Sequence, residues 1–382
     1  MFALRHPVNT LKNFTGIVSQ LSFRHEDSYF VNKSLNFYLG RLLFNAIKYP
    51  PVLLHALVFF NRQMTFEVSD RCNLTCEGCH YFEDSNYQPR KPTDIEDYNK
   101  YFDLHHEKLK DLDTIHIAGA EASLELEKVR YLTSRAKNYV LYSNGIKKIP
   151  DDIKARIHIS AWELDDAKIR GASVLHKAIS NYRNDERAVF IITITHANIE
   201  QLRKLSDTIL AAGIRVSYNH YSPTGQFLKS VKQKISSKYI KFSSAENNLI
   251  LNKQDFARSR EIIDELIDEY PDKILYTHDY NAWVHNPDPN GIRKRDQEGE
   301  VYCSVNFNRR PDMYYRIITS ELQDKPGKCC FPDISCRSCR LYSSAWPDFL
   351  VNAVENLRTQ SDVKKLSKSL RIYRQLFQYE EA

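Results

Sequence analysis

Three cysteines are spaced so that one short loop can carry all of them, in the segment Cys72-Asn-Leu-Thr-Cys76-Glu-Gly-Cys79, which His80 follows directly. Thiolates are the usual ligands of iron–sulfur clusters. Three of them leave the fourth iron of a [4Fe–4S] cluster without a cysteine ligand, and a substrate can bind at such an open metal position. A zinc site made by the three cysteines and His80 is the alternative.

The other five cysteines lie between residues 303 and 339. Four thiolates from this group can complete a second [4Fe–4S] cluster, with a structural zinc as the alternative. Eight cysteines among 382 residues are too sparse for a disulfide scaffold, and their grouping is typical of metal binding in a reducing compartment. The expected ligands of the second centre are Cys303, Cys336, Cys339 and one of Cys329 and Cys330.

A regular alternation of strand and helix begins at residue 64 and must position these cysteines. It predicts parallel βα units, and hence a partial (β/α)6 TIM-like barrel whose chemistry lies at the carboxyl ends of the strands. The first cysteine group directly follows the first strand, at that edge. The predicted strands are 65–69, 114–118, 139–143, 157–161, 189–195 and 214–219, and helices are predicted over 95–110, 124–137 and 199–212.

The composition changes along the chain, and these changes indicate five regions, including the barrel. We expect an N-terminal helical segment at 1–62, the core barrel at 63–225 and a connecting region at 226–300. A cysteine-rich auxiliary region at 301–345, with a strand near 314–320, and C-terminal helices at 346–382 follow. Helices within 35–60 are expected to cover the barrel, with a peripheral membrane contact as the alternative.

Composition excludes several classes of protein. Hydrophobic residues make up 42% and charged residues 27%, so the chain is not disordered. No run of 18 apolar residues is present, and the first ten residues lack a signal-peptide pattern. A net charge of +6 does not predict a nucleic-acid partner. A cytoplasmic protein is expected.

With three cysteines at this spacing after the first strand of a six-fold βα pattern, the sequence resembles the radical S-adenosylmethionine (radical SAM) enzymes over residues 64–221. The resemblance implies that Cys72, Cys76 and Cys79 hold a [4Fe–4S] cluster whose fourth iron is chelated by SAM. A one-electron donor such as flavodoxin or ferredoxin would reduce the cluster. The C5′–S bond of SAM would then break to give methionine and a 5′-deoxyadenosyl radical, which abstracts hydrogen from a substrate.

The segment Gly119-Ala120-Glu121-Ala122 after the second strand resembles the Gly-Gly-Glu-Pro of that family. By this resemblance, Glu121 accepts hydrogen bonds from the SAM ammonium group, a charge-assisted contact. A solvated acid at the start of a helix is the alternative for Glu121. A non-catalytic iron–sulfur or zinc-binding scaffold remains the competing class of protein, with Ala120 and Ala122 as signs that SAM use was lost.

Weaker matches follow the third and fourth strands. Asn144, in Ser143-Asn144-Gly145, resembles a turn of the family, with an ordinary turn as the alternative. Ser160 would contact the SAM carboxylate or ribose, or is only a small residue facing the core. The position before Cys79 is often aromatic in the family but is Gly78 here, so packing against adenine is assigned to Tyr81 or Phe82.

The second cysteine group resembles the SPASM or twitch extensions of radical SAM enzymes, with room for one four-cysteine cluster. Substrate-facing residues are expected after the later strands. Glu163, His196 and Tyr221 are the catalytic candidates, and a Glu or His there can shuttle a proton. Asn219 and His220 are further candidates. A solvated face is expected from the basic residues, with attraction of a phosphate, carboxylate or nucleotide as the alternative. These residues are Lys229, Lys232, Lys234, Lys238 and Lys241.

The sequence carries no helix-wing module for leader-peptide capture in 1–62. This favours a small molecule, sugar, nucleotide or lipid precursor as substrate over a peptide, and a peptide-modifying maturase is the alternative.

Overall fold

The computed structural model describes most of the chain beyond residue 62. The described residues are 63–79, 81, 93–110, 112, 114–234, 240–288, 292, 294–295, 299, 301–302, 315–325, 334 and 339–379. Several predictions lie outside them, namely those for 1–62, His80, Phe82, Lys238, Cys303, Cys329, Cys330 and Cys336.

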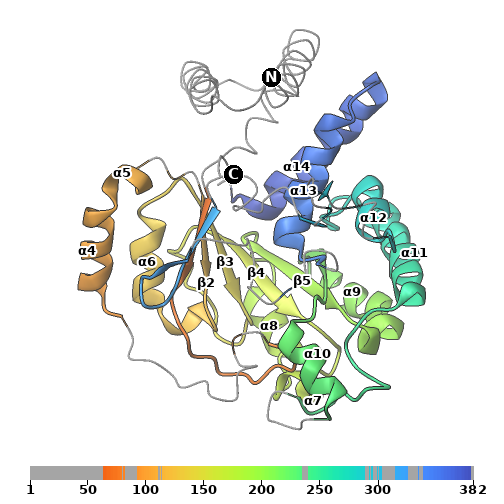
Figure 1. Ribbon diagram of the computed structural model, residues 1–382, viewed down its shortest axis with the longest axis horizontal. Coiled ribbons are helices and arrows are strands. Elements are labelled where there is room, and N and C mark those ends of the chain that lie inside the picture. The colour runs from red at the N-terminus through yellow and green to blue at the C-terminus, as the bar shows by residue number, and fades with distance from the viewer. Residues whose placement is uncertain are drawn as a thin grey trace.

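An eight-stranded sheet lies at the centre of the described part (Figure 1). Six of its strands pair in chain order and in parallel, as an open sheet, which confirms the predicted partial barrel. Apolar residues of strand-forming type fill these strands, and β5 is buried at every position. The six are β1 (Gln63–Glu67), β2 (Thr114–Ala118), β3 (Asn138–Ser143), β4 (Arg156–Ala161), β5 (Ala188–Ile194) and β6 (Arg215–His220).

The first strand begins two residues earlier than the sequence indicates, because it has a partner on each side. Gln63 pairs with Thr114 of β2 and with Tyr315 of β9 (Tyr315–Ile318). β9 is the strand expected near 314–320, and it lies parallel to β1 at the edge of the core sheet. The short β10 (Asp324–Lys325) then pairs antiparallel with β9.

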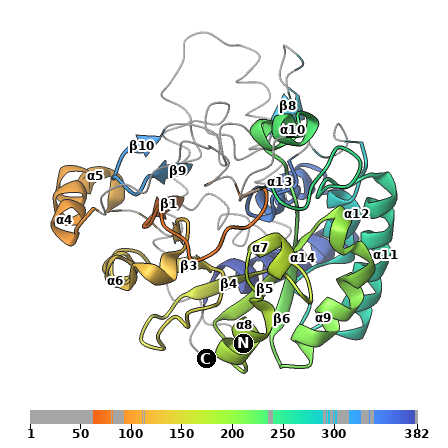
Figure 2. The same cartoon turned by 90° about the horizontal axis from the view of Figure 1, so that it is seen from below.

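Helices cover the outer side of the curved sheet (Figure 2). Leu202, Leu205 and Ile209 are buried on α9, at the spacing of an amphipathic helix. The helix predicted over 95–110 is interrupted at His105 and forms two helices. The helices of this layer are α4 (Ile95–Leu104), α5 (His106–Leu109), α6 (Leu126–Thr133), α8 (Leu175–Tyr182) and α9 (Leu202–Leu210), whereas α7 (Ala167–Arg170) lies at the carboxyl edge of the sheet (Figure 1).

The described chain after β6 is mainly helical. An isolated parallel bridge between Val216 and Ile274 extends the pairing beyond β6. The elements are α10 (Gly225–Lys232), α11 (Lys253–Glu269), α12 (His278–Val284), β7 (Lys294–Arg295), β8 (Val301–Tyr302), α13 (Tyr342–Glu355) and α14 (Gln360–Phe377). α13 and α14 are the two C-terminal helices that the sequence predicts. None of the helices within the described residues combines the length and the apolar character needed to cross a membrane.

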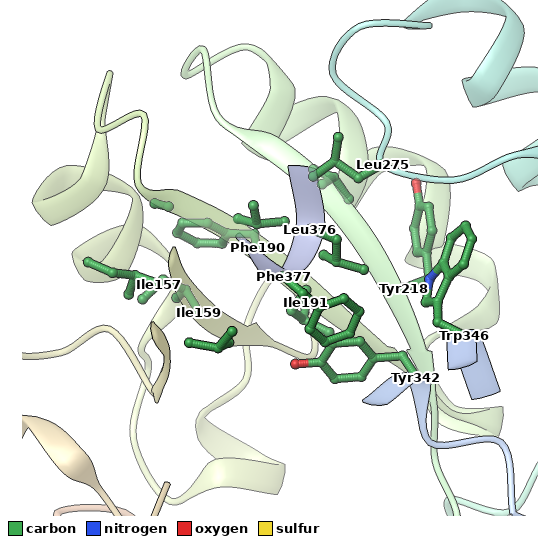
Figure 3. Packing of buried hydrophobic residues seen from close by; sticks show 14 of the residues in the cluster. Ile157, Ile159, Phe190, Ile191, Tyr218, Leu275, Tyr342, Trp346, Leu376 and Phe377 are labelled. Atoms are coloured by element: carbon green, nitrogen blue, oxygen red, sulfur yellow. The ribbon is translucent and has the colours of Figure 1, made fainter. Parts of the chain in front are cut away.

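The two C-terminal helices pack on the inner side of the sheet. Figure 3 shows Tyr342 of α13 beside Phe377 of α14, and their rings stack with centroids 5.8 Å apart. His158 of β4 binds both helices, through its Nδ1 to the Tyr342 hydroxyl at 2.7 Å and its Nε2 to the Leu376 carbonyl at 2.6 Å. The inner side is therefore closed by a hydrogen-bonded aromatic layer.

Candidate functional site

The predicted site residues lie at one edge of the sheet. The cysteine loop follows β1, and Glu121 and Asn144 follow β2 and β3. Glu163 follows β4, and Tyr221 follows β6. Because parallel strands all end at the same edge, the fold brings together residues that are up to about 150 positions apart in the sequence.

Backbone hydrogen bonds fix the cysteine loop on both sides of Cys76. The Thr75 N–H donates to the Arg170 carbonyl at 3.2 Å, and the Glu77 N–H donates to the Ile169 carbonyl at 2.8 Å. The side chain of Glu77 is fully buried, although the residue lies between two candidate metal ligands. Its carboxylate accepts three backbone N–H groups, from residues 241, 242 and 243, at 2.6–2.8 Å. The loop is thus held by α7 on one side and by the 241–243 segment on the other.

The Cys72 thiol lies among donors as well as apolar neighbours. The Leu74 N–H approaches its Sγ at 3.4 Å, and the Asn144 Nδ2 lies 3.8 Å away. Burial raises the pKa of the Cys72 thiol to about 11, although these donors oppose the shift. The thiol therefore keeps its proton at neutral pH until a metal displaces it.

Cys72, Cys76 and Cys79 are each partly exposed on this loop. Within the described ranges, no three Cys, His, Asp or Glu side chains converge closely enough to hold a single metal ion. A zinc site on these cysteines would also take His80, which lies outside the described residues. A [4Fe–4S] cluster makes a different demand, because each thiolate binds a different iron.

Glu121 is buried and organises the neighbouring strand ends. Its carboxylate accepts the Ser143 hydroxyl at 2.7 Å, the Asn144 N–H at 2.8 Å and the Ser123 N–H at 3.1 Å. It is only 2% exposed, so it is not a solvated acid, but it does lie at a helix start, because it caps the short helix η2 (Ala122–Leu124). An ionised carboxylate offers about four acceptor positions, so one remains for a further donor. Its contact with a SAM ammonium group stays a prediction.

Gly119 is required by the close approach of two strand ends. It has φ +142°, and a Cβ there would lie 2.8 Å from the carbonyl oxygen of Ser69. The adjacent Ala120 N–H donates to that same oxygen at 2.8 Å. Gly119 and Ala120 therefore join the ends of β1 and β2, and Ala122 is buried without strain.

Ser160 at the end of β4 is bound to two side chains. Its hydroxyl accepts the Trp162 Nε1–H at 3.0 Å, and its carbonyl accepts Arg170 Nη1 at 2.8 Å. It is partly exposed, and both its contact with SAM and the alternative of a small residue facing the core stay predictions. Arg170 is 2% exposed and forms an ion pair with the fully buried Asp166.

Tyr221 packs against the cysteine loop itself. A Cβ on Gly78, which has φ +66°, would lie 2.1 Å from the Tyr221 hydroxyl oxygen. The Tyr221 and Trp162 rings lie 6.1 Å apart. The pair Tyr221–Trp162 thus lies beside Gly78, the position for which the family resemblance would lead one to expect an aromatic residue. Tyr81 is also described and is partly buried.

The other two catalytic candidates differ in their surroundings. Glu163 is 9% exposed, and burial, reinforced by Asp166, raises the pKa of its carboxyl group to about 7. His196 is more open, and its Nδ1 contacts the Asp255 carboxylate of α11 at 2.8 Å. The Glu163 carboxyl group therefore changes its protonation state near neutral pH, whereas His196 is an imidazole oriented by a carboxylate.

Asn219 and His220 have structural partners. The Asn219 side-chain oxygen accepts the Tyr342 N–H at 3.1 Å and so holds the start of α13. His220 is 1% exposed, with its Nε2 2.9 Å from that of His285. Of the predicted basic face, Lys229, Lys232 and Lys234 are exposed, whereas the Lys241 ammonium donates to the Thr75 carbonyl in the cysteine loop.

Cys339 is the described member of the second cysteine group, and it is buried. Its neighbour Arg340 donates its backbone N–H to the Ser222 hydroxyl at 3.0 Å, just beyond β6. Ile334 forms an isolated bridge with Thr224 in the same loop. Cys339 therefore lies at the same edge of the sheet as the first cysteine group.

Sequence reasoning missed Glu77 and Arg170, which both contact the cysteine loop. An acidic residue between metal ligands and an arginine in a four-residue helix look like surface charges. The weak signal for Glu77 was its place in the loop itself, where a buried carboxylate must find several donors.

Comparisons with known proteins address the fold. No protein-family model matches the sequence, and no curated protein matches it. The structure of anSMEcpe with bound AdoMet superposes with a TM-score of 0.50 at 11% identity, covering 84% of this chain and 100% of that one. Streptococcus suis SuiB bound to S-adenosylmethionine gives a TM-score of 0.47 at 15% identity, with 78% and 71% covered. The likeness to anSMEcpe confirms the fold that the resemblance to radical SAM enzymes implies.

Proposed function

We propose that this chain is a radical SAM enzyme that cleaves SAM reductively and abstracts hydrogen from a substrate. The observation that carries the proposal is the cysteine loop at the carboxyl end of β1, with Glu121, Asn144 and Ser160 at the ends of the next three strands. The likeness in fold to an AdoMet-bound protein supports SAM as the ligand at this edge.

The residues of the loop fit a [4Fe–4S] cluster. Cys72, Cys76 and Cys79 supply three thiolates, which is the donor set that such a cluster takes. Among the described residues, the buried Arg170 Nε has no hydrogen-bond partner, so a donor beside the loop remains for a cluster sulfur or thiolate. When bound, the reduced cluster supplies one electron to the SAM sulfonium, which yields methionine and a 5′-deoxyadenosyl radical.

The chain's own residues would bind and orient SAM. Glu121 has one acceptor position left for the ammonium group, next to Asn144, which also contacts Cys72. Ser160 offers a hydroxyl toward the carboxylate or ribose. Tyr81 is the candidate for packing against adenine, and the aromatic pair Tyr221–Trp162 offers a second apolar surface at the loop.

Proton transfer to or from the substrate is assigned to Glu163 and His196. Glu163 lies in a buried setting that keeps its carboxyl group partly protonated near pH 7. His196 is held by Asp255, so one ring nitrogen stays available. Both follow strands whose ends form the same edge as the cysteine loop.

A second [4Fe–4S] cluster is proposed on Cys303, Cys336, Cys339 and one of Cys329 and Cys330. The position of Cys339 beside the loop after β6 supports a centre at the same edge, where it can exchange an electron with a substrate radical. Replacing Cys72, Cys76 and Cys79 together by alanine should leave iron bound to the protein. Zinc in place of iron in that variant would overturn the second cluster.

The substrate is proposed to be a biosynthetic small molecule, sugar, nucleotide or lipid precursor. The electron donor is a cytoplasmic flavodoxin or ferredoxin, and the enzyme works in that compartment. A peripheral membrane contact through 35–60 would be detected by flotation with liposomes.

The test is anaerobic reconstitution with iron and sulfide, followed by dithionite and SAM. We expect 5′-deoxyadenosine and methionine in equal amounts from the natural protein and from Leu104→Ala, an exposed control on α4. Cys76→Ala should form neither product. An intact cluster that yields no 5′-deoxyadenosine would establish the non-catalytic scaffold instead.

A further inference from the structure

Arg170 is a buried cation beside the second cysteine of the loop. It ends α7, and both residues that flank Cys76 donate backbone N–H groups to its helix, Thr75 to the Arg170 carbonyl and Glu77 to the Ile169 carbonyl. The Arg170 side chain is only 2% exposed. A guanidinium keeps its charge at all physiological pH values, so a full positive charge lies inside the wall of the site.

Two contacts hold the guanidinium in place. Its Nη1 donates to the Ser160 carbonyl at 2.8 Å and lies 3.3 Å from the Asp166 carboxylate. Asp166 is itself fixed, since its other oxygen accepts the Val174 N–H at 2.7 Å. Burial lowers the pKa of Arg170, but attraction to Cys76 and then to Asp166 outweighs it, so the net direction is upward. The backbone hydrogen bonds on both sides of Cys76 place the end of α7, and with it Arg170, beside this cysteine.

One N–H donor of Arg170 is left without an acceptor in the described part of the chain. Its Nε is buried and has no hydrogen-bond partner among the described residues. A buried donor without a partner is costly, so natural structures retain one mainly where a ligand, ion or water satisfies it. Cys76 is the candidate cluster ligand that lies next to it.

We propose that Arg170 is a positioning residue that stabilises the reduced state of the cluster through Cys76. The inference rests on the proposed function, because it needs a cluster on Cys72, Cys76 and Cys79. Reduction adds one negative charge to the cluster, and a nearby fixed cation in a buried setting favours that state. Hydrogen bonds to the sulfurs and net charge are established determinants of cluster potential. Asp166 acts in the opposite direction, because it partly neutralises the guanidinium.

Because Arg170 and Asp166 carry opposite charges, removing one or the other should shift the reduction potential of the cluster in opposite directions. The midpoint potential of the reconstituted protein is measured by redox titration followed by electron paramagnetic resonance, without turnover. Arg170→Gln should lower the equilibrium constant for one-electron reduction about tenfold, which is about 59 mV. Arg170→Lys should lie between this variant and the natural protein. Asp166→Asn should raise the constant, and Arg183→Gln, an exposed arginine, should leave it unchanged.

Arg170→Gln leaves the buried Asp166 carboxylate without a cation and so can prevent folding. The double variant Arg170→Gln/Asp166→Asn avoids this, and it should have a lower reduction constant than Asp166→Asn alone. A constant that is unchanged or higher on loss of Arg170, or one that falls in both Arg170→Gln and Asp166→Asn, overturns the inference. The absence of any reducible cluster signal in the natural protein would instead overturn the proposed function.

Discussion

The carboxylate of Glu77 accepts a hydrogen bond of 2.6 Å from the backbone N–H of Phe242, which lies 165 positions later in the chain. Its neighbours Lys241 and Ser243 donate to the same carboxylate. A loop that carries three candidate metal ligands is therefore anchored by a buried anion. The anchor makes the shape of the loop depend on a segment that supplies no ligand.

Glu77→Gln should destabilise the protein by roughly 2–4 kcal/mol, because the amide keeps one acceptor oxygen and turns a donor toward another N–H. Urea unfolding measures this free energy, and iron content after reconstitution should fall in parallel. Glu127→Gln makes the same change on the exposed side of α6 and serves as the control. Equal stability of the two variants would contradict the anchoring role.

Gly78→Ala should be destabilising for two separable reasons. The positive φ of +66° costs roughly 1–2 kcal/mol for any residue with a Cβ. The added methyl group also meets the Tyr221 hydroxyl oxygen at 2.1 Å. Gly299→Ala isolates the first cost, because Gly299 has φ +82° and nothing lies within 4 Å of a Cβ there.

Combining Gly78→Ala with Tyr221→Ala should recover part of the loss. We expect a coupling energy of about 0.5–3 kcal/mol in a double-mutant cycle measured by thermal unfolding. Strictly additive losses would show that Tyr221 does not pack over Gly78.

Stability should fall as the pH drops below about 6.5. Burial lowers the pKa of His116 to about 4 and that of His158 to about 3. Between those values and 6.5 the unfolded chain binds more protons than the native state. Each histidine then lowers the free energy of unfolding by up to about 1.4 kcal/mol for every pH unit of acidification. Above pH 6.5 its contribution to stability is fully present.

Unfolding in urea across pH 5–7 tests this titration. His116→Asn keeps an acceptor for the Tyr142 hydroxyl. It should reduce the slope of the unfolding free energy against pH by the contribution of one histidine. His176→Asn changes an exposed histidine of α8 and should leave the slope as it is. An identical slope in all three proteins would be inconsistent with neutral buried imidazoles.

Glu163 should contribute a pH dependence of the opposite sign. Burial, followed by repulsion from Asp166, raises its pKa to about 7, so between the unfolded value near 4.5 and pH 7 the native state binds the extra proton. Stability from this group is present below pH 4.5 and is lost as the pH rises to 7. Glu163→Gln should therefore gain stability relative to the natural protein over that window.

The comparison is made by urea unfolding at several pH values, with Glu200→Gln as an exposed control. If Glu163 carries a proton in the reaction, the same substitution also removes the change in product formation around pH 7. A constant stability difference across the window would contradict the raised pKa.

Sequence patterns predicted the sheet well because each strand carries its own signal. Runs such as 189–195 are apolar and β-branched, and the observed Ala188–Ile194 differs by one residue. The cysteine spacing indicated the loop for the same local reason. Contacts that join distant segments leave no periodicity, so the pairing of β1 with β9 and the anchoring of Glu77 were not predictable.

The sequence also did not indicate which charged residues are buried. Arg170 and Asp166 lie four positions apart on a short helix, where such pairs are usually exposed. Only the tertiary fold shows that Ser160 and the cysteine loop enclose them. His220 was predicted to face the substrate, because a histidine at a strand end is a common proton carrier. In the structure its ring contacts that of His285 instead.

The position of β9 has a consequence for biogenesis. β1 has β2 on one side and β9 on the other, and β9 is formed by residues 315–318. The residues of β9 are synthesised about 250 positions after β1, so β1 acquires its second neighbour late. The strand that leads into the cysteine loop therefore has one open edge until a segment from a distant part of the sequence pairs with it.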